Sequence, residues 1–221
     1  MAYTPDLERL LTPGAARVDG LVTYRIERHV IGDAVLPTGQ VVGCDPLVGR
    51  DGAEPFTIQA PPGRYPLVAS VAVLYRDGVE LQRRVAALQL VVRDRPADRW
   101  EPALVAGQSA AALGDEDLFG YTVDAGMGTL ADLAAVRALA GWDHERVEDA
   151  YIVPDVPQAP VPGLVGAVVD QETGANVVTV ETGWGDGVYP TFVGRTSAGE
   201  VSSFLTDFMV LPDQVPRFLT P

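Results

Sequence analysis

The chain has no lysine, one cysteine and two histidines among its 221 residues. Without lysine it cannot contain a Walker phosphate-binding loop. The single cysteine, Cys44, excludes an intrachain disulfide and is expected to be a small buried hydrophobe. Neither His29 nor His144 lies in a catalytic signature, and no serine lies in a Gly-x-Ser-x-Gly elbow, so a hydrolase triad has no support.

Long hydrophobic runs and an excess of positive charge are also missing. No apolar segment approaches the roughly 18 residues of a membrane span, and the N-terminus lacks the pattern of a signal peptide. The formal net charge is −14, from 30 acidic and 16 basic residues. This balance argues against nucleic acid and against an anionic membrane as partners. We therefore expect a cytoplasmic protein that attracts cations or a basic protein partner.

The composition nevertheless predicts a packed core, with 47% hydrophobic residues and a mean hydropathy of +0.12. We expect one domain over residues 1–221. Its first half has the pattern of strands and hairpins: a helix over 4–14 with Thr4 as N-cap, a strand over 21–32, and a strand, turn and strand over 33–47. The richest β region is 50–94, in which Asp77-Gly78 predicts a tight hairpin.

In the second half, the apolar residues recur at roughly three-residue steps, which is the spacing of a helix, in place of the alternation of a strand. We expect partly helical structure over 96–120, a helix from about Thr129 to Gly141, and a short helix from Asp143 to Tyr151. A proline-rich loop is predicted over 154–176 and a three-stranded meander over 177–211. This order favours an α+β fold, mainly antiparallel sheet with a central helical segment.

Four phrases carry a resemblance to a known family. They are LPTGQVVGCDPL, PPGRYPLVAS, YTVDAGMGTLAD and GWGDGVYPTFVGRTSAGEVSSFLTDF. With them the chain, from about residue 25 to 211, resembles the bacterial domain of unknown function 4241 family. That resemblance implies a single domain and carries no known activity.

The glycine-rich phrase VDAGMGTLAD contains Gly126-x-Gly128 between an expected strand and an expected helix. A phosphate could bind at such a helix N-terminus. The third glycine of a dinucleotide fingerprint is missing, however, and Asp124 would repel a phosphate. The phrase therefore does not predict a nucleotide site.

Carboxylates are the stronger chemical signal, because several lie in or beside the family-like phrases. The acids concerned are Asp45, Asp124, Asp132, Glu181, Asp186 and Asp207. Oxygen ligands of this kind suit Ca²⁺ or Mg²⁺, with Asp124 and Asp186 as the candidate metal ligands. Paired carboxylates could also perform acid/base chemistry. The structural alternative is that these acids cap turns and helix starts, and a third is contact with a partner.

Two tyrosines precede prolines in similar phrases, Tyr65-Pro66 and Tyr189-Pro190. Proline biases each tyrosine to an extended conformation, so both phrases predict the start of a strand. Ligand contact by either tyrosine is the alternative. Trp184, between two glycines, is either a core anchor or an exposed recognition residue.

Two functional classes follow. The first is a binding, interaction or regulatory protein, favoured by the acidic charge and the absence of a catalytic signature. The second is a carboxylate- or divalent-metal-dependent hydrolase, favoured by the glycine-flanked acids. Convergence of Asp45, Asp124, Asp186 and Asp207 in one pocket would favour the hydrolase.

Overall fold

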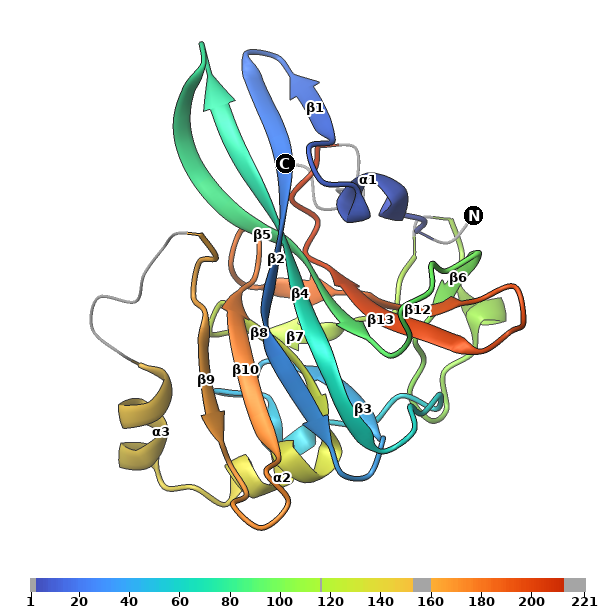
Figure 1. The fold of residues 1–221 in the computed structure, drawn as a ribbon, viewed down its shortest axis with the longest axis vertical. Helices are drawn as coiled ribbons and strands as arrows, with labels where there is room; N and C mark the ends of the chain where they lie inside the picture. The colour runs from blue at the N-terminus through green and yellow to red at the C-terminus, as the bar shows by residue number, and fades with distance from the viewer. Residues whose placement is uncertain (1–2, 116, 153–159, 213–221) are drawn as a thin grey trace.

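The computed structural model describes residues 3–115, 117–152 and 160–212. Within these residues the strands form a seven-stranded sheet, a four-stranded sheet and a two-stranded ribbon. Every pairing between these strands is antiparallel. This confirms the predicted α+β class with a mainly antiparallel sheet (Figure 1).

The strands and helices have the following bounds. The seven-stranded sheet has the order β1 (Ala16–Asp19), β2 (Val22–Leu36), β4 (Gly63–Arg76), β5 (Val79–Val91), β13 (Val201–Asp207), β12 (Thr191–Arg195) and β6 (Arg99–Pro102). The four-stranded sheet has the order β3 (Val41–Cys44), β8 (Met127–Asp132), β10 (Asn176–Glu181) and β9 (Val165–Val168). The ribbon pairs β7 (Tyr121–Val123) with β11 (Gly187–Tyr189). The helices are α1 (Leu7–Leu11), α2 (Leu133–Ala140) and α3 (His144–Tyr151), with 3-10 turns η1 (Arg50–Gly52) and η2 (Ala110–Ala112).

The two larger sheets pack face to face, and helices cover their outer sides. Between the sheets, Leu67 and Val71 of β4 belong to one buried cluster with Leu130 of β8 and Val180 of β10. The other face of the four-stranded sheet packs against α2 and α3, and the other face of the large sheet packs against α1. The whole buried run from 67 to 74 in β4 follows from this position, since a strand covered on both faces is apolar throughout.

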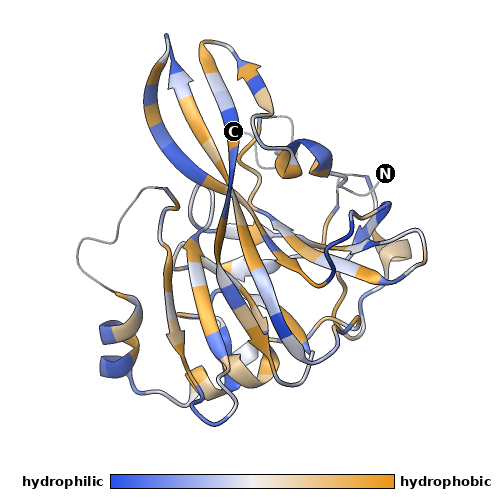
Figure 2. Ribbon diagram, viewed as in Figure 1, coloured by the Kyte–Doolittle hydropathy of each residue, from blue (hydrophilic) through white to orange (hydrophobic). Residues whose placement is uncertain are grey.

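The β4–β5 hairpin turns at Asp77 and Gly78, as predicted. Both residues have positive φ, 53° and 77°, which a type I′ hairpin turn requires. The upper ends of β2, β4 and β5 project beyond the rest of the molecule (Figure 1). Figure 2 shows several hydrophilic residues on the projecting part of this hairpin, and hydrophilic and hydrophobic residues interspersed along the strands of the body.

Several predicted boundaries in the first half are wrong. The first helix is capped by Asp6, not Thr4, because the Asp6 side chain accepts the Arg9 N–H. The predicted break after residue 32 is a bulge within the single strand β2, where the register shifts between Val30 and Gly32. The stretch 96–120, predicted to be partly helical, contains strand β6 and only the short turn η2.

The predicted helix start at Thr129 is also wrong. Residues 127–132 form β8, and α2 begins at Leu133. The Thr129 hydroxyl donates to the Val178 carbonyl of β10, so sheet pairing overrides the helical pattern. Asp132 is the N-cap of α2 and Asp143 is the N-cap of α3, which confirms the predicted capping role for Asp132.

The predicted loop and meander near the C-terminus need correction. Residues 154–159 of the loop over 154–176 lie outside the described residues, but 165–168 form β9, paired with β10. Residues 165–168 alternate between half-buried and exposed, as an edge strand does. The prolines of the segment led to the prediction of a loop instead. The meander is divided, because β10 belongs to the four-stranded sheet and only β12 and β13 pair with each other.

We predict that Asp132 contributes far more stability than its counterpart Asp143. The buried Asp132 carboxylate accepts the N–H groups of Thr38 (3.0 Å), Gly39 (2.9 Å) and Ala134 (2.8 Å), whereas exposed Asp143 accepts only that of Arg146 (2.9 Å). Asp132→Ala should lower the free energy of unfolding by at least about 3 kcal/mol. The substitution leaves several buried N–H donors without an acceptor, and each such donor costs about 1–3 kcal/mol.

Asp143→Ala is the matched control and should lose about 0.5–2 kcal/mol as an ordinary helix cap. Urea denaturation of both variants measures the two losses. Equal losses would contradict the anchoring role of Asp132.

Candidate functional site

Asp45 is a structural anchor. Its side chain is fully buried, and one carboxylate oxygen accepts the N–H groups of Ala125 (2.7 Å) and Asp124 (3.2 Å). The other oxygen accepts the Leu47 N–H at 3.0 Å. These three hydrogen bonds hold the loop after β7 against the loop after β3. They also occupy most of the acceptor sites of the carboxylate, which leaves Asp45 little capacity to bind a metal or a substrate.

The two proposed metal ligands, Asp124 and Asp186, do lie at the same end of the ribbon. The register pairs Val123 with Gly187, so Asp124 and Asp186 are the next positions across from each other. Both residues are exposed. Among the residues that the structure describes, however, no group of three or more histidines, cysteines and acids could hold a metal ion. The four acids required by the hydrolase hypothesis therefore do not form a single cluster.

The loop that carries Trp184, residues 182–187, is held rigidly; we call it the Trp184 loop. The Thr182 hydroxyl donates to the Gly185 carbonyl at 2.8 Å, and the Gly185 N–H donates back to the Thr182 carbonyl at 2.6 Å. The Gly183 N–H donates to Val85 of β5, and the Thr182 N–H to Gly126. These bonds join the Trp184 loop both to the large sheet and to the loop that Asp45 anchors.

Gly183 is required by close packing. Its φ is +41°, and a Cβ at this position would lie 2.4 Å from the carbonyl oxygen of Phe208. Trp184 follows at once and remains 49% exposed, with the Arg84 guanidinium 5.0 Å from the ring centroid. Trp184 is therefore not a core anchor, which leaves the recognition hypothesis. The sequence pattern did not identify Arg84, because its contact with Trp184 spans 100 residues.

Tyr65 and Tyr189 share one structural device. The Tyr65 hydroxyl donates to the Pro61 carbonyl and that of Tyr189 to the Gly185 carbonyl, each at 2.7 Å and each four residues back. Each ring folds over the glycine two residues earlier, in the manner of a tyrosine corner. Each phrase also lies at a strand start, as predicted: β4 begins at Gly63, and β12 begins after Pro190.

Asp207 is fully buried, and its partner is a residue that the sequence pattern did not identify. The Tyr3 hydroxyl donates to one carboxylate oxygen at 2.7 Å, and the Met209 N–H donates to the other at 2.8 Å. Burial raises the pKa of Asp207 to about 7, although both hydrogen bonds oppose the shift. The carboxyl thus ties the N-terminal segment to the end of β13.

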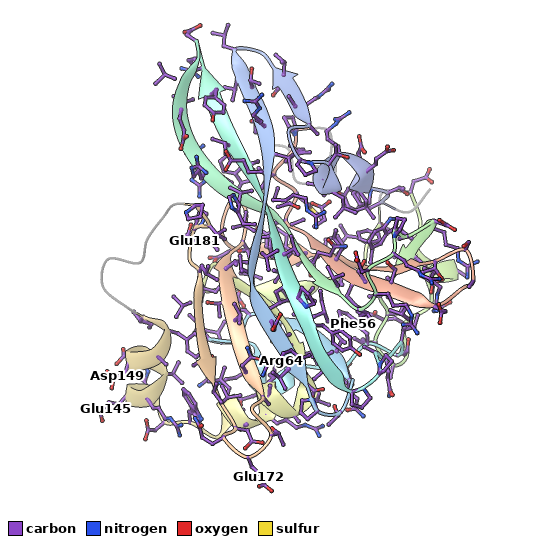
Figure 3. All side chains as sticks on the ribbon, in the orientation of Figure 1. Phe56, Arg64, Glu145, Asp149, Glu172 and Glu181 are labelled. Atoms are coloured by element: carbon purple, nitrogen blue, oxygen red, sulfur yellow. The ribbon has the colours of Figure 1, made fainter. Side chains whose placement is uncertain are left out.

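Cys44 is buried, as expected. Burial, with a contribution from Asp45, raises the pKa of its thiol to about 12. Because the thiolate is the nucleophilic form, Cys44 is unreactive at neutral pH. Acids that the sequence did not single out, such as Glu145 and Asp149 of α3, point outward into solvent (Figure 3).

A family model described as a protein of unknown function, DUF4241, matches residues 34–206. The chain therefore belongs to this family, as the four phrases indicated. No curated protein and no solved structure matches the chain. None of the helices in the described part of the chain has the length and hydropathy needed to cross a membrane.

We predict that Asp207 makes stability depend on pH. Its folded-state pKa of about 7 lies above the ordinary aspartate value of 3.8, so the folded protein binds the proton more tightly. The stability that proton binding to Asp207 gives the folded state is complete below the carboxyl's unfolded-state pKa, and it is lost as the pH rises through 7. Between about pH 5 and about pH 8, the unfolding free energy should fall by about 1–3 kcal/mol relative to Asp207→Asn.

Urea denaturation of both proteins across this range measures the difference. Parallel pH profiles for the wild type and Asp207→Asn would contradict the shifted pKa.

Proposed function

We propose that this protein is a binding protein whose recognition surface centres on the Trp184 loop. The observation that carries the proposal is the combination of a half-exposed tryptophan with a backbone held by hydrogen bonds on both sides. A loop already ordered before binding loses little conformational entropy when a partner arrives. Tryptophan and arginine are also the residue types most enriched at binding hot spots.

Two exposed acids near Trp184 favour a basic partner, although Arg84 places one positive charge against the ring. Asp186 lies two residues from Trp184, and Asp124 lies across the ribbon from Asp186. Both acids are exposed. The net charge of −14 adds a long-range field of the same sign. The partner that fits is a protein with an apolar pocket for the indole ring, bordered by arginine or lysine.

The metal-dependent hydrolase is the second candidate. It is supported by the common location of Asp124 and Asp186 at one end of the ribbon. It is weakened because Asp45 and Asp207 are occupied by internal hydrogen bonds. Two exposed carboxylates supply few of the six to eight oxygen ligands that Ca²⁺ takes.

The test of the binding proposal compares Trp184→Ala with Ile152→Ala, a control at another exposed hydrophobic residue. A partner captured by the wild-type chain is purified and its affinity for each variant is measured by calorimetry. Trp184→Ala should weaken binding by a factor of about 30 or more, equivalent to a hot spot of about 2 kcal/mol. Both variants should unfold near the wild-type temperature.

Equal affinity of the partner for wild type, Trp184→Ala and Asp186→Asn would contradict the proposal. Stabilisation of the wild type by Ca²⁺ or Mg²⁺ that disappears in Asp186→Asn would instead support the metal-dependent hydrolase.

A further inference from the structure

A large groove lies on the outer face of the seven-stranded sheet. Its volume is about 1310 Å³. One wall is the N-terminal segment from Tyr3 to Pro13, and the other is the segment from Arg93 to Pro102. The floor consists of side chains from β2, β4, β5, β12 and β13, and no residue of the Trp184 loop lines it.

Arg28 of β2 is the charged group on this floor. Its guanidinium donates to the Leu11 carbonyl at 3.2 Å and to the side-chain oxygen of Gln89. Both acceptors are neutral, and no ion pair to Arg28 occurs among the described residues. Burial lowers the pKa of Arg28, yet arginine keeps its proton in proteins. The floor of the groove thus carries an uncompensated positive charge.

Unused hydrogen-bonding capacity lies at the same place. The Arg28 Nε and the Ser70 hydroxyl are both buried without a partner. The two residues are direct cross-strand neighbours, because the β2–β4 register pairs Arg28 with Ser70. A guanidinium has five donors, and two hydrogen bonds leave three of them available. Buried polar groups without partners are rare in native proteins, and of this pair Arg28 lines the groove, so its free donors favour a ligand that supplies an acceptor there.

The charged side chains of the groove lining sum to zero when Arg28 is included. Besides Arg28, the lining contains Arg93, Arg95, Arg99, Asp6, Glu8, Asp94 and Asp98. Arg93 pairs with Glu200, outside the groove lining, at 3.1 Å. The strongly acidic chain therefore provides a nearly neutral groove, with the half-buried charge of Arg28 on its floor.

The floor beside Arg28 is apolar. Val30, two residues along β2, is 74% exposed and pairs across the sheet with Val68 of β4. Phe192 and Trp100 also line the groove. An exposed valine next to other apolar side chains is a surface that an apolar ligand would cover.

We propose that this groove binds an amphiphilic monocarboxylate, with the carboxylate on Arg28 and the apolar body along Val30, Val68 and Phe192. The planar guanidinium matches a carboxylate through two parallel hydrogen bonds. The single cation on the floor neutralises one negative charge, so the site suits a carboxylate better than a phosphate dianion. This site is independent of the proposed Trp184 surface.

The test uses calorimetric titration of the full chain with three probes of equal chain length: octanoate, octanamide and octyl phosphate. Octanoate should bind at least tenfold more tightly than octanamide, and more tightly than octyl phosphate. Arg28→Gln should abolish the preference for octanoate over octanamide. Arg99→Gln, which removes a charge elsewhere in the groove lining, is the matched control and should leave the preference within about twofold.

Amide chemical-shift changes in the wild type provide a measurement that does not depend on variants. Octanoate should shift the amides of Val30, Val68 and Gln89. Equal affinity for octanoate and octanamide, or no binding of either, would overturn the proposal. So would a preference that survives in Arg28→Gln, tighter binding of octyl phosphate, or shifts located elsewhere.

Discussion

The fold depends on hydrogen bonds between buried carboxylates and backbone N–H groups far away in the sequence. Asp45 accepts from Asp124 and Ala125, and Asp132 accepts from Thr38 and Gly39. A buried carboxylate without partners would destabilise the protein by several kcal/mol, so each such bond is strongly selective for one loop arrangement. In these two cases the bonds join segments separated by about 80 to 95 positions, and they lie beyond the two ends of the β3–β8 pairing.

This constraint accounts for the Trp184 loop. Asp45 holds Ala125, the neighbouring Gly126 carbonyl accepts the Thr182 N–H, and Thr182 exchanges two hydrogen bonds with Gly185. The Tyr189 hydroxyl then donates to the same Gly185 carbonyl. The exposed indole of Trp184 is therefore positioned by a chain of contacts that begins at a buried acid. The acids of the family-like phrases divide accordingly into internal anchors and two exposed residues, Asp124 and Asp186.

Local patterns predicted local structure well. The Asp77-Gly78 hairpin, the short helix that ends at Tyr151 and the strand starts at the two Tyr-Pro phrases depend on neighbouring residues and were predicted correctly. Features that depend on distant partners were not. The buried state of Asp45, the Tyr3 contact of Asp207 and the unpaired charge of Arg28 each arise from packing between segments that no spacing rule connects.

The most direct test of the anchoring role is amide hydrogen exchange in the wild type and in Asp45→Asn. Asparagine has one side-chain carbonyl oxygen in place of two carboxylate oxygens, so it cannot accept from both Leu47 and Ala125. We predict that the Ala125 and Gly185 amides exchange slowly in the wild type and lose protection together in Asp45→Asn. The Leu90 amide in the centre of the large sheet should stay protected. Unchanged protection of Ala125, or loss at Ala125 with Gly185 unaffected, would contradict the account.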